Sequence, residues 1–181
     1  MENKIPILKL EVSIDFTEEA MRWLKRVNAN NNLWFAKEGG KNFLKKHEEE
    51  WKNILEDESD QVIQNYFSEL GFEEQFLPKT KITYAGFGSW DMEAVAFINS
   101  IPFEEIRALI ECAYEAPIVM YELKKLEYTI KEKFHKRTNE KARALLSEQA
   151  EQEDLSTPPD QVIEMKKFDI DTSPLEALLE Q

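Results

Sequence analysis

The sequence predicts an α+β fold in which a small antiparallel sheet of about three strands is covered by several helices. Residues 7–16 alternate strictly between apolar and polar side chains, which is the pattern of a half-buried strand. Two more strand-like segments flank a glycine-containing stretch at residues 85–89, whereas most of the remaining chain has apolar residues at helical spacing. Because 42% of the 181 residues are apolar, the chain can bury a core, and wholesale disorder is excluded.

The first strand, at residues 7–16, leads directly into a predicted helix. Its inward face is expected to consist of Leu8, Leu10, Val12, Ile14 and Phe16. Thr17 then provides a side-chain oxygen that can cap the first turn of the helix. The asparagine-rich run at residues 28–32 is expected to end this helix, because asparagine side chains compete for helical hydrogen bonds.

Two further helices and a hairpin are expected next. The first helix carries an apolar stripe over residues 43–55, and the second begins at Ser59 as its N-cap and ends at Gly71. Strands at residues 81–84 and 90–98 then form the hairpin. The sheet face that the helices cover is expected to comprise Leu10, Val12, Ile82, Tyr84, Val95 and Phe97.

The C-terminal half of the chain is predicted to begin with helices. Pro102 suits the first turn of one helix, and Pro117 makes the chain kink or restart before a long amphipathic helix at residues 119–146. We expect residues 1–147 to form the α+β domain. Residues 148–181 are expected to form an acidic linker that ends in a short recognition helix.

This expected tether, residues 148–181, holds ten acids and two lysines, so it carries −8 of the net charge of −13. Ser173 and Glu176 have the spacing of a capping box, which predicts a short helix. Its apolar residues are Leu175, Leu178 and Leu179. Such a helix is too short to be stable alone in water and needs a groove, either on its own domain or on a partner. The alternative is that the tail folds back, with its acids bridging the basic residues within 136–141.

The charge balance, 36 acids against 23 bases, disfavours direct binding of nucleic acid, because the net field repels phosphates. The same charge permits an acidic inhibitor that mimics nucleic acid and occupies a basic groove of a target, which is the alternative function. No segment has the roughly 18 uncharged residues of a membrane helix, so no membrane association is expected. A single cysteine, Cys112, fits a reducing cytoplasm.

Residue pairs that resemble catalytic or metal sites have simpler structural explanations. His47 and Glu50 lie three apart on a helix, but the chain has only two histidines with which to complete a metal site. Asp91 and Glu93 point to the same side of a strand, which is equally the polar face of that strand. Cys112 lies among apolar residues and is expected to be inert. We therefore expect no catalytic residue, no metal ion and no cofactor.

Aromatic and apolar residues in turn-rich or extended segments have the character of protein-contact hot spots. The predicted partner-binding residues are Trp34, Phe35, Phe87, Trp90, Phe134, Phe168, Leu175, Leu178 and Leu179. The basic cluster at residues 131–143 can contact phosphate or an acidic partner, and the helix at residues 119–146 can form a homodimer. The predicted function is that of a non-enzymatic interaction, adaptor or regulatory protein whose partner is another protein.

Ile82, Tyr84, Gly88, Ser89 and Trp90 form a strand, a turn and a second strand, after which a helix is expected. This stretch resembles small adaptor domains of bacterial conflict systems. Those domains have Tyr-Gly-Ser as a contiguous motif, whereas other residues intervene here. The resemblance covers this stretch alone, includes no catalytic motif and implies an accessory protein of antiviral defence.

Overall fold

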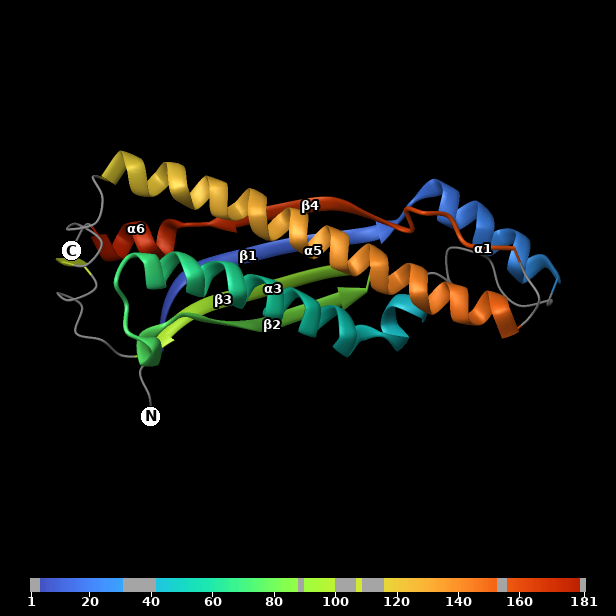
Figure 1. Cartoon of the computed structure of the whole chain (residues 1–181), viewed down its shortest axis with the longest axis horizontal. Coiled ribbons are helices and arrows are strands. Elements are labelled where there is room, and N and C mark those ends of the chain that lie inside the picture. Colours follow the sequence, from blue (N-terminus) through green and yellow to red (C-terminus); the bar gives the residue numbers. More distant parts are fainter. Residues whose placement is uncertain are drawn as a thin grey trace.

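The protein has two layers, a four-stranded antiparallel sheet and two helices that lie across one of its faces (Figure 1). The computed structural model describes residues 4–30, 42–87, 90–99, 107–108, 116–152 and 156–179. The two covering helices are α3 (Glu48–Glu69) and α5 (Ala116–Gln152). Helix α1 (Glu18–Asn30) lies at one end of the sheet and α6 (Ser173–Leu179) at the other.

The strands lie in the order β2, β3, β1, β4, and each neighbouring pair is antiparallel. Their bounds are Lys4–Phe16 for β1, Lys79–Phe87 for β2, Trp90–Asn99 for β3 and Ile163–Asp171 for β4. The predicted α+β class and the antiparallel sheet are confirmed, but the sheet has four strands rather than three. Trp34, Phe35 and Cys112 lie outside the described residues, and of the helix expected from Pro102 only residues 107–108 are described, both helical.

Strand β1 is central, and its predicted inward face is confirmed. Leu8, Leu10, Val12, Ile14 and Phe16 are all 4% exposed or less. The predicted N-cap of α1 is present as well, since the Ala20 N–H donates to Thr17 Oγ1 at 3.1 Å.

Helix α3 is one continuous helix, whereas two were predicted with a break at Ser59. Leu55, Ser59 and Ile63 follow each other at a spacing of four, and all three are fully buried. Packing of this stripe therefore overrides the preference of serine for a helix terminus. The helix ends as predicted at Gly71, whose φ is 94°. The Phe72 N–H donates to Phe67 O at 3.1 Å, which completes a Schellman motif.

Three residues expected on the covered face of the sheet lie on its other face. In β3 the buried residues are Trp90, Met92, Ala94, Ala96 and Ile98, so Val95 and Phe97 point the opposite way. In β2 the register shifts between Ile82 and Tyr84, and Thr83 is the extra residue. This bulge reverses the alternation, so that Tyr84 pairs with Glu93 and is 54% exposed.

The C-terminal segment expected to be a free tether instead supplies the fourth strand. Strand β4 pairs with β1 along its length, and Ile163 and Phe168 are buried. Helix α5 continues past the expected boundary at residue 147 as far as Gln152. The tail joins the sheet because its apolar residues complete the inward face beside β1. Among the described residues, the tail meets a base of α5 through Asp160, which pairs with Arg143 at 2.6 Å, outside the expected range 136–141.

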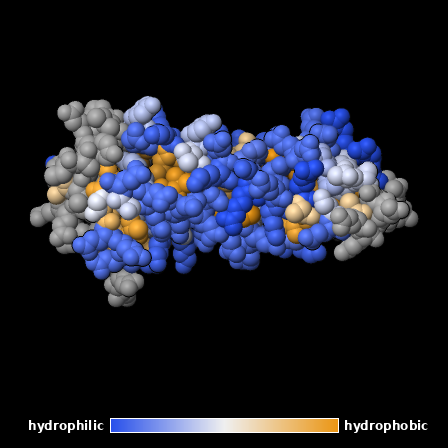
Figure 2. Space-filling view, in the orientation of Figure 1, coloured by the Kyte–Doolittle hydropathy of each residue, from blue (hydrophilic) through white to orange (hydrophobic). Residues whose placement is uncertain are grey.

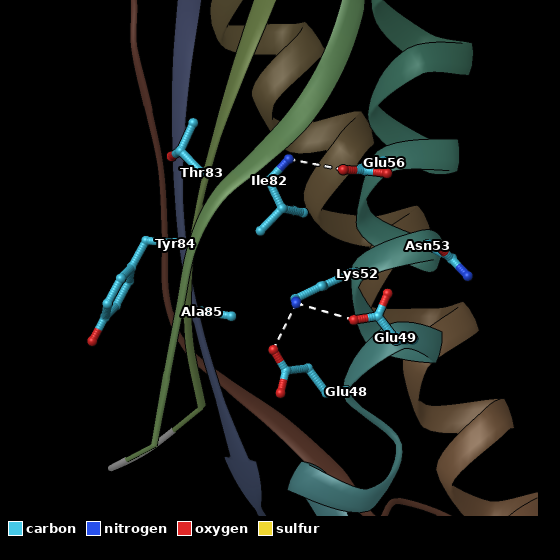
Figure 3. A pocket seen from close by; sticks show the side chains of 9 residues that line it. All are labelled: Glu48, Glu49, Lys52, Asn53, Glu56, Ile82, Thr83, Tyr84 and Ala85. Carbon is cyan, nitrogen blue, oxygen red and sulfur yellow. Dashed lines mark hydrogen bonds and ion pairs between the residues drawn. The ribbon is translucent and has the colours of Figure 1, made fainter.

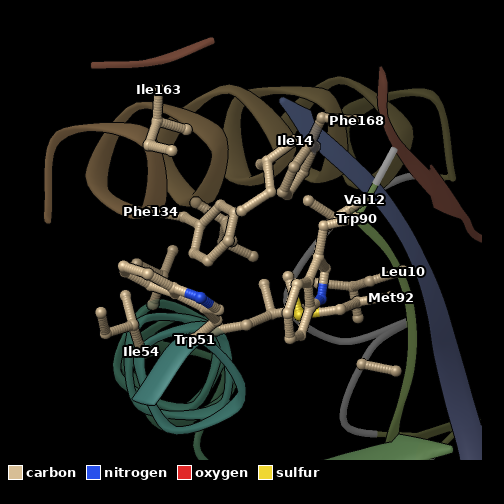
Figure 4. Close-up of a cluster of buried hydrophobic side chains, with 14 of the residues drawn as sticks. Leu10, Val12, Ile14, Trp51, Ile54, Trp90, Met92, Phe134, Ile163 and Phe168 are labelled. Carbon is tan, nitrogen blue, oxygen red and sulfur yellow. The ribbon is translucent and has the colours of Figure 1, made fainter. Parts of the chain in front are cut away.

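The core lies between the sheet and the two covering helices. Figure 4 shows residues of β1, β3 and β4 meeting side chains of both helices at its centre. The apolar stripe of α5, at Leu123, Leu126, Ile130 and Phe134, faces this core. Trp51 and Ile54 of α3 close the core from the side of β2.

Candidate functional site

The residues predicted to bind a partner belong to the core wherever their side chains are described. Four of the nine are buried: Trp90, Phe134, Phe168 and Leu175. They are buried because Trp90 and Phe168 lie on the inward face of the sheet, while Phe134 and Leu175 face the core from helices. Leu178 is partly buried against the same core. The side chains of Phe87 and Leu179, and all of Trp34 and Phe35, lie outside the description.

His47 and Glu50, considered above as metal ligands, lie next to each other, with 2.9 Å between His47 Nδ1 and Glu50 Oε2. Within the described ranges, no group of three or more histidine, cysteine, aspartate or glutamate side chains could hold a metal ion. Within the same ranges, no helix is both long and apolar enough to cross a membrane.

Helix α3 bonds one half of edge strand β2 through side chains spaced four residues apart. The Gln64 side-chain amide donates to Pro78 O at 2.9 Å. The Thr80 N–H donates to an Asp60 carboxylate oxygen, and the Ile82 N–H donates to Glu56 Oε1 at 2.8 Å. Burial raises the pKa of Asp60, and the bonds from Thr80 oppose that rise. These side chains replace the neighbouring strand that an edge strand lacks.

Helix α5 holds the start of the other edge strand, β4, in the same manner. Asn139 Oδ1 accepts the N–H groups of Val162 and Ile163 at 2.6 and 3.0 Å, and its amide donates to Asp160 O at 2.9 Å. His135 Nε2 lies 3.1 Å from Ile163 O. Both edges of the sheet are therefore tied to the helix layer by polar side chains.

Between α3 and the second half of β2 lies a cleft of about 380 Å³. Lys52 and Glu48 continue the series of α3 side chains at spacing four that bond β2, and both line this cleft. They bond each other at 2.6 Å and do not bond the strand. Glu49 bonds Lys52 from the other side at 3.2 Å. Figure 3 shows Lys52 reaching toward β2 and the Tyr84 side chain pointing away from the cleft.

The cleft is acidic. Its lining includes three carboxylates, those of Glu48, Glu49 and Glu56, against the single ammonium group of Lys52. The hydrogen bond to Glu48 is the largest cause of a raised pKa of Lys52, so this lysine is charged at neutral pH. Two negative charges remain in excess, and they favour a basic ligand.

Exposed aromatic side chains lie away from the predicted set. Among the residues that the structure covers, the large apolar side chains with the most exposure are Tyr84 at 54%, Tyr121 at 69% and Tyr128 at 67%. Tyr121 and Tyr128 are seven residues apart on α5, so they lie on the same face of that helix. The exposed side chains of Lys124 and Lys125 lie between them. Figure 2 shows that the face seen there is mostly hydrophilic, with small separate hydrophobic patches.

The sequence contains a signal for this pair. Tyr121 and Tyr128 have helical spacing, yet they fall outside the apolar stripe that starts at Leu123. A tyrosine pair on the polar side of a helix is available for contact because the core does not use it.

Comparisons of the chain with protein-family models, with curated proteins and with solved structures found no significant match. The site must therefore be interpreted from its own chemistry.

Proposed function

We propose that the protein is a non-enzymatic adaptor that binds another protein through the exposed face of α5. The observation that carries the proposal is the pair of exposed tyrosines, Tyr121 and Tyr128, one above the other on this helix. Tyrosine supplies a large contact area with few rotatable bonds, which is why it is enriched at binding hot spots. The α5 face is defined here as Tyr121, Lys124, Lys125 and Tyr128.

The charges of the α5 face indicate the kind of partner. Lys124 and Lys125 are exposed, and Lys131 follows on the same side of the helix. As defined, the face carries two lysines and no acid, although Lys125 also pairs with Glu122 at 3.5 Å and the whole chain carries −13. A protein surface that combines acidic and apolar side chains is complementary to it. The short resemblance at residues 82–90 favours a bacterial conflict system as the setting.

The alternative, an acidic mimic of nucleic acid, is less well supported. A mimic needs a row of unpaired carboxylates on a rigid surface. On α3, however, Asp57 and Glu58 bind Arg137 at 3.2 and 2.9 Å. Glu48 and Glu49 of the same helix are bonded to Lys52. These two bases contact four of the eight acids of α3, which interrupts any row of unpaired carboxylates along this helix.

The test places a photo-crosslinking amino acid at position 121 or 128 and exposes the purified chain to lysate of the native organism. We expect both positions to form an adduct with the same defined protein, identified by mass spectrometry. The yield should fall at high salt, because the lysine contacts are screened. The double variant Tyr121→Ser/Tyr128→Ser should lose this protein without a change in melting temperature, since both side chains are exposed.

Lys136→Ser, another exposed position on α5, serves as the matched control and should keep the partner. A partner that the double tyrosine variant still binds would contradict the proposal. An adduct that contains only a second copy of the chain would indicate a homodimer instead.

A further inference from the structure

The two halves of edge strand β2 differ in how their outer edge is protected. The first half, Lys79–Ile82, has two lysines and receives the bonds from α3 described above. The second half, Thr83–Phe87, contains no charged residue and no proline. Among the described side chains of α3, none bonds the β2 backbone beyond Ile82. Sheet edges without charge, proline or cover are the ones that pair with another strand.

The opposite edge of the sheet lacks such a segment. Strand β4 has charged side chains throughout its length, at Glu164, Lys166, Lys167, Asp169 and Asp171. Its register shifts at Lys166, so the bulge itself carries a charge. In the described sheet, the stretch Thr83–Phe87 is therefore the edge best suited to accept an added strand.

We propose that Thr83–Phe87 is a docking edge for an extended peptide with basic side chains at alternate positions. A strand added beside β2 projects every second side chain toward the α3 layer, where the acidic cleft lies. A lysine or arginine there meets Glu48, Glu49 and Glu56, which exceed the charge of Lys52 by two. The cleft thus provides charge complementarity at the positions where the peptide enters it.

The other alternate side chains of the peptide face the open side of the sheet, where Tyr84 lies. The Tyr84 side chain covers Gly86 in the same strand, because a Cβ atom at Gly86 would clash with Tyr84 Oη. The flat surface of this ring and glycine suits apolar or aromatic cross-strand neighbours. The preferred sequence therefore alternates basic and apolar residues.

This inference rests on the proposed adaptor function, to which it adds a second partner class on a different surface. The test here uses neither Tyr121 nor Tyr128, so its failure leaves the result on the α5 face unaffected. The probe is the synthetic peptide acetyl-Lys-Val-Lys-Val-Lys-Val-amide, added to the full chain and followed by NMR of backbone amides. We expect shifts confined to residues 82–87 of β2 and to the start of α3.

Two N-methylated versions of the peptide separate backbone pairing from charge attraction. In one version the backbone amide nitrogen of every lysine is methylated, and in the other the backbone amide nitrogen of every valine is methylated. Alternate N–H groups of a strand point to opposite sides, so only one version should lose binding. Equal binding of both versions would overturn the proposal, as would equal binding of the Glu-Val analogue or absence of binding.

A charge reversal in the cleft gives an independent readout. Glu49→Lys should weaken binding about tenfold or more, because it places like charges together. Glu132→Lys, an equal change of charge at an exposed position on α5, should leave the affinity unchanged. An equal loss in both variants would overturn the proposal. So would sedimentation that shows the free chain to be a dimer that Thr83→Lys dissociates, because a second copy would then occupy this edge.

Discussion

Asp60 is the titratable side chain that joins the two layers most directly. Its carboxylate accepts the Thr80 N–H of β2 from a partly buried position on α3. Burial is the largest cause of its raised pKa, and nearby Glu56 adds to the rise. The folded state therefore binds the Asp60 proton more tightly than the unfolded state. The stability that this proton provides is fully present below the ordinary pKa of 3.8 and is lost as the pH rises through the raised folded-state pKa.

The variant Asp60→Asn tests this linkage. Asparagine keeps an oxygen for the Thr80 N–H but has no charge to bury. The melting temperature of the variant minus that of the wild type should therefore increase as the pH rises from about 4 to about 7. Thermal unfolding measured across this range checks the prediction, with Glu69→Gln at an exposed position of α3 as the control. A difference that stays constant with pH would show that Asp60 is not buried as described.

At the scale of elements, each covering helix holds the edge strand next to it. Asn139 is the clearest case, because one side chain satisfies three backbone groups at the start of β4. Thr17 and Trp23 hold the preceding residues from the side of α1, by bonds of 2.8 Å to Gln161 O and 3.0 Å to Ser156 O. The residues that lead into β4 are thus held in place on the N-terminal side of the segment that pairs with β1.

We expect Asn139→Ala to lower the free energy of unfolding by about 1–3 kcal/mol, because it leaves partly buried backbone groups without partners. Urea denaturation checks the value. Lys136→Ala, one turn earlier on the exposed side of α5, should change the stability much less. Equal effects of the two substitutions would mean that Asn139 acts only through helix propensity.

The edge strands also show why part of the fold escapes sequence reasoning. Strand β1 alternates without a break and is predictable. In β4 the residues paired with the inward face of β1 are Ile163, Met165, Phe168 and Ile170, which are spaced by two, three and two. The bulge at Lys166 causes the middle step, so a search for period two does not find this strand. The acidic residues around β4 then favour the interpretation of this segment as a flexible tether.

The two candidate sites also differ in how far they can be predicted from the sequence. The α5 face is readable in principle, because two tyrosines at helical spacing lie off the apolar stripe. The cleft beside β2 is not, because it depends on the bulge at Thr83 and on where α3 crosses the edge. Both are long-range relations that local spacing does not contain.

For the whole molecule, β4 and the helix after it complete the sheet and the core. Val162, Ile163, Phe168 and Leu175 are buried, and deletion of residues 153–181 would expose their neighbours on β1 and α5. Truncating one large buried side chain costs about 2–5 kcal/mol, and a whole domain is stable by about 5–15 kcal/mol. The deletion variant should therefore lose cooperative unfolding, which calorimetry measures. If the truncated chain melts at the same temperature as the full protein, the interpretation of the C-terminal segment as a flexible tether would be supported.

The single substitution Phe168→Ala tests the same point without removing chain. Phe168 pairs with Val12 of the central strand and is buried. Its truncation should lower the free energy of unfolding by about 3–5 kcal/mol, because it leaves a cavity in the core. Lys166→Ala is the control in the same strand, since Lys166 is exposed at the bulge. If both variants unfold at the wild-type denaturant concentration, β4 does not contribute to the core. A loss confined to Phe168→Ala places the C-terminal segment inside the cooperative unit.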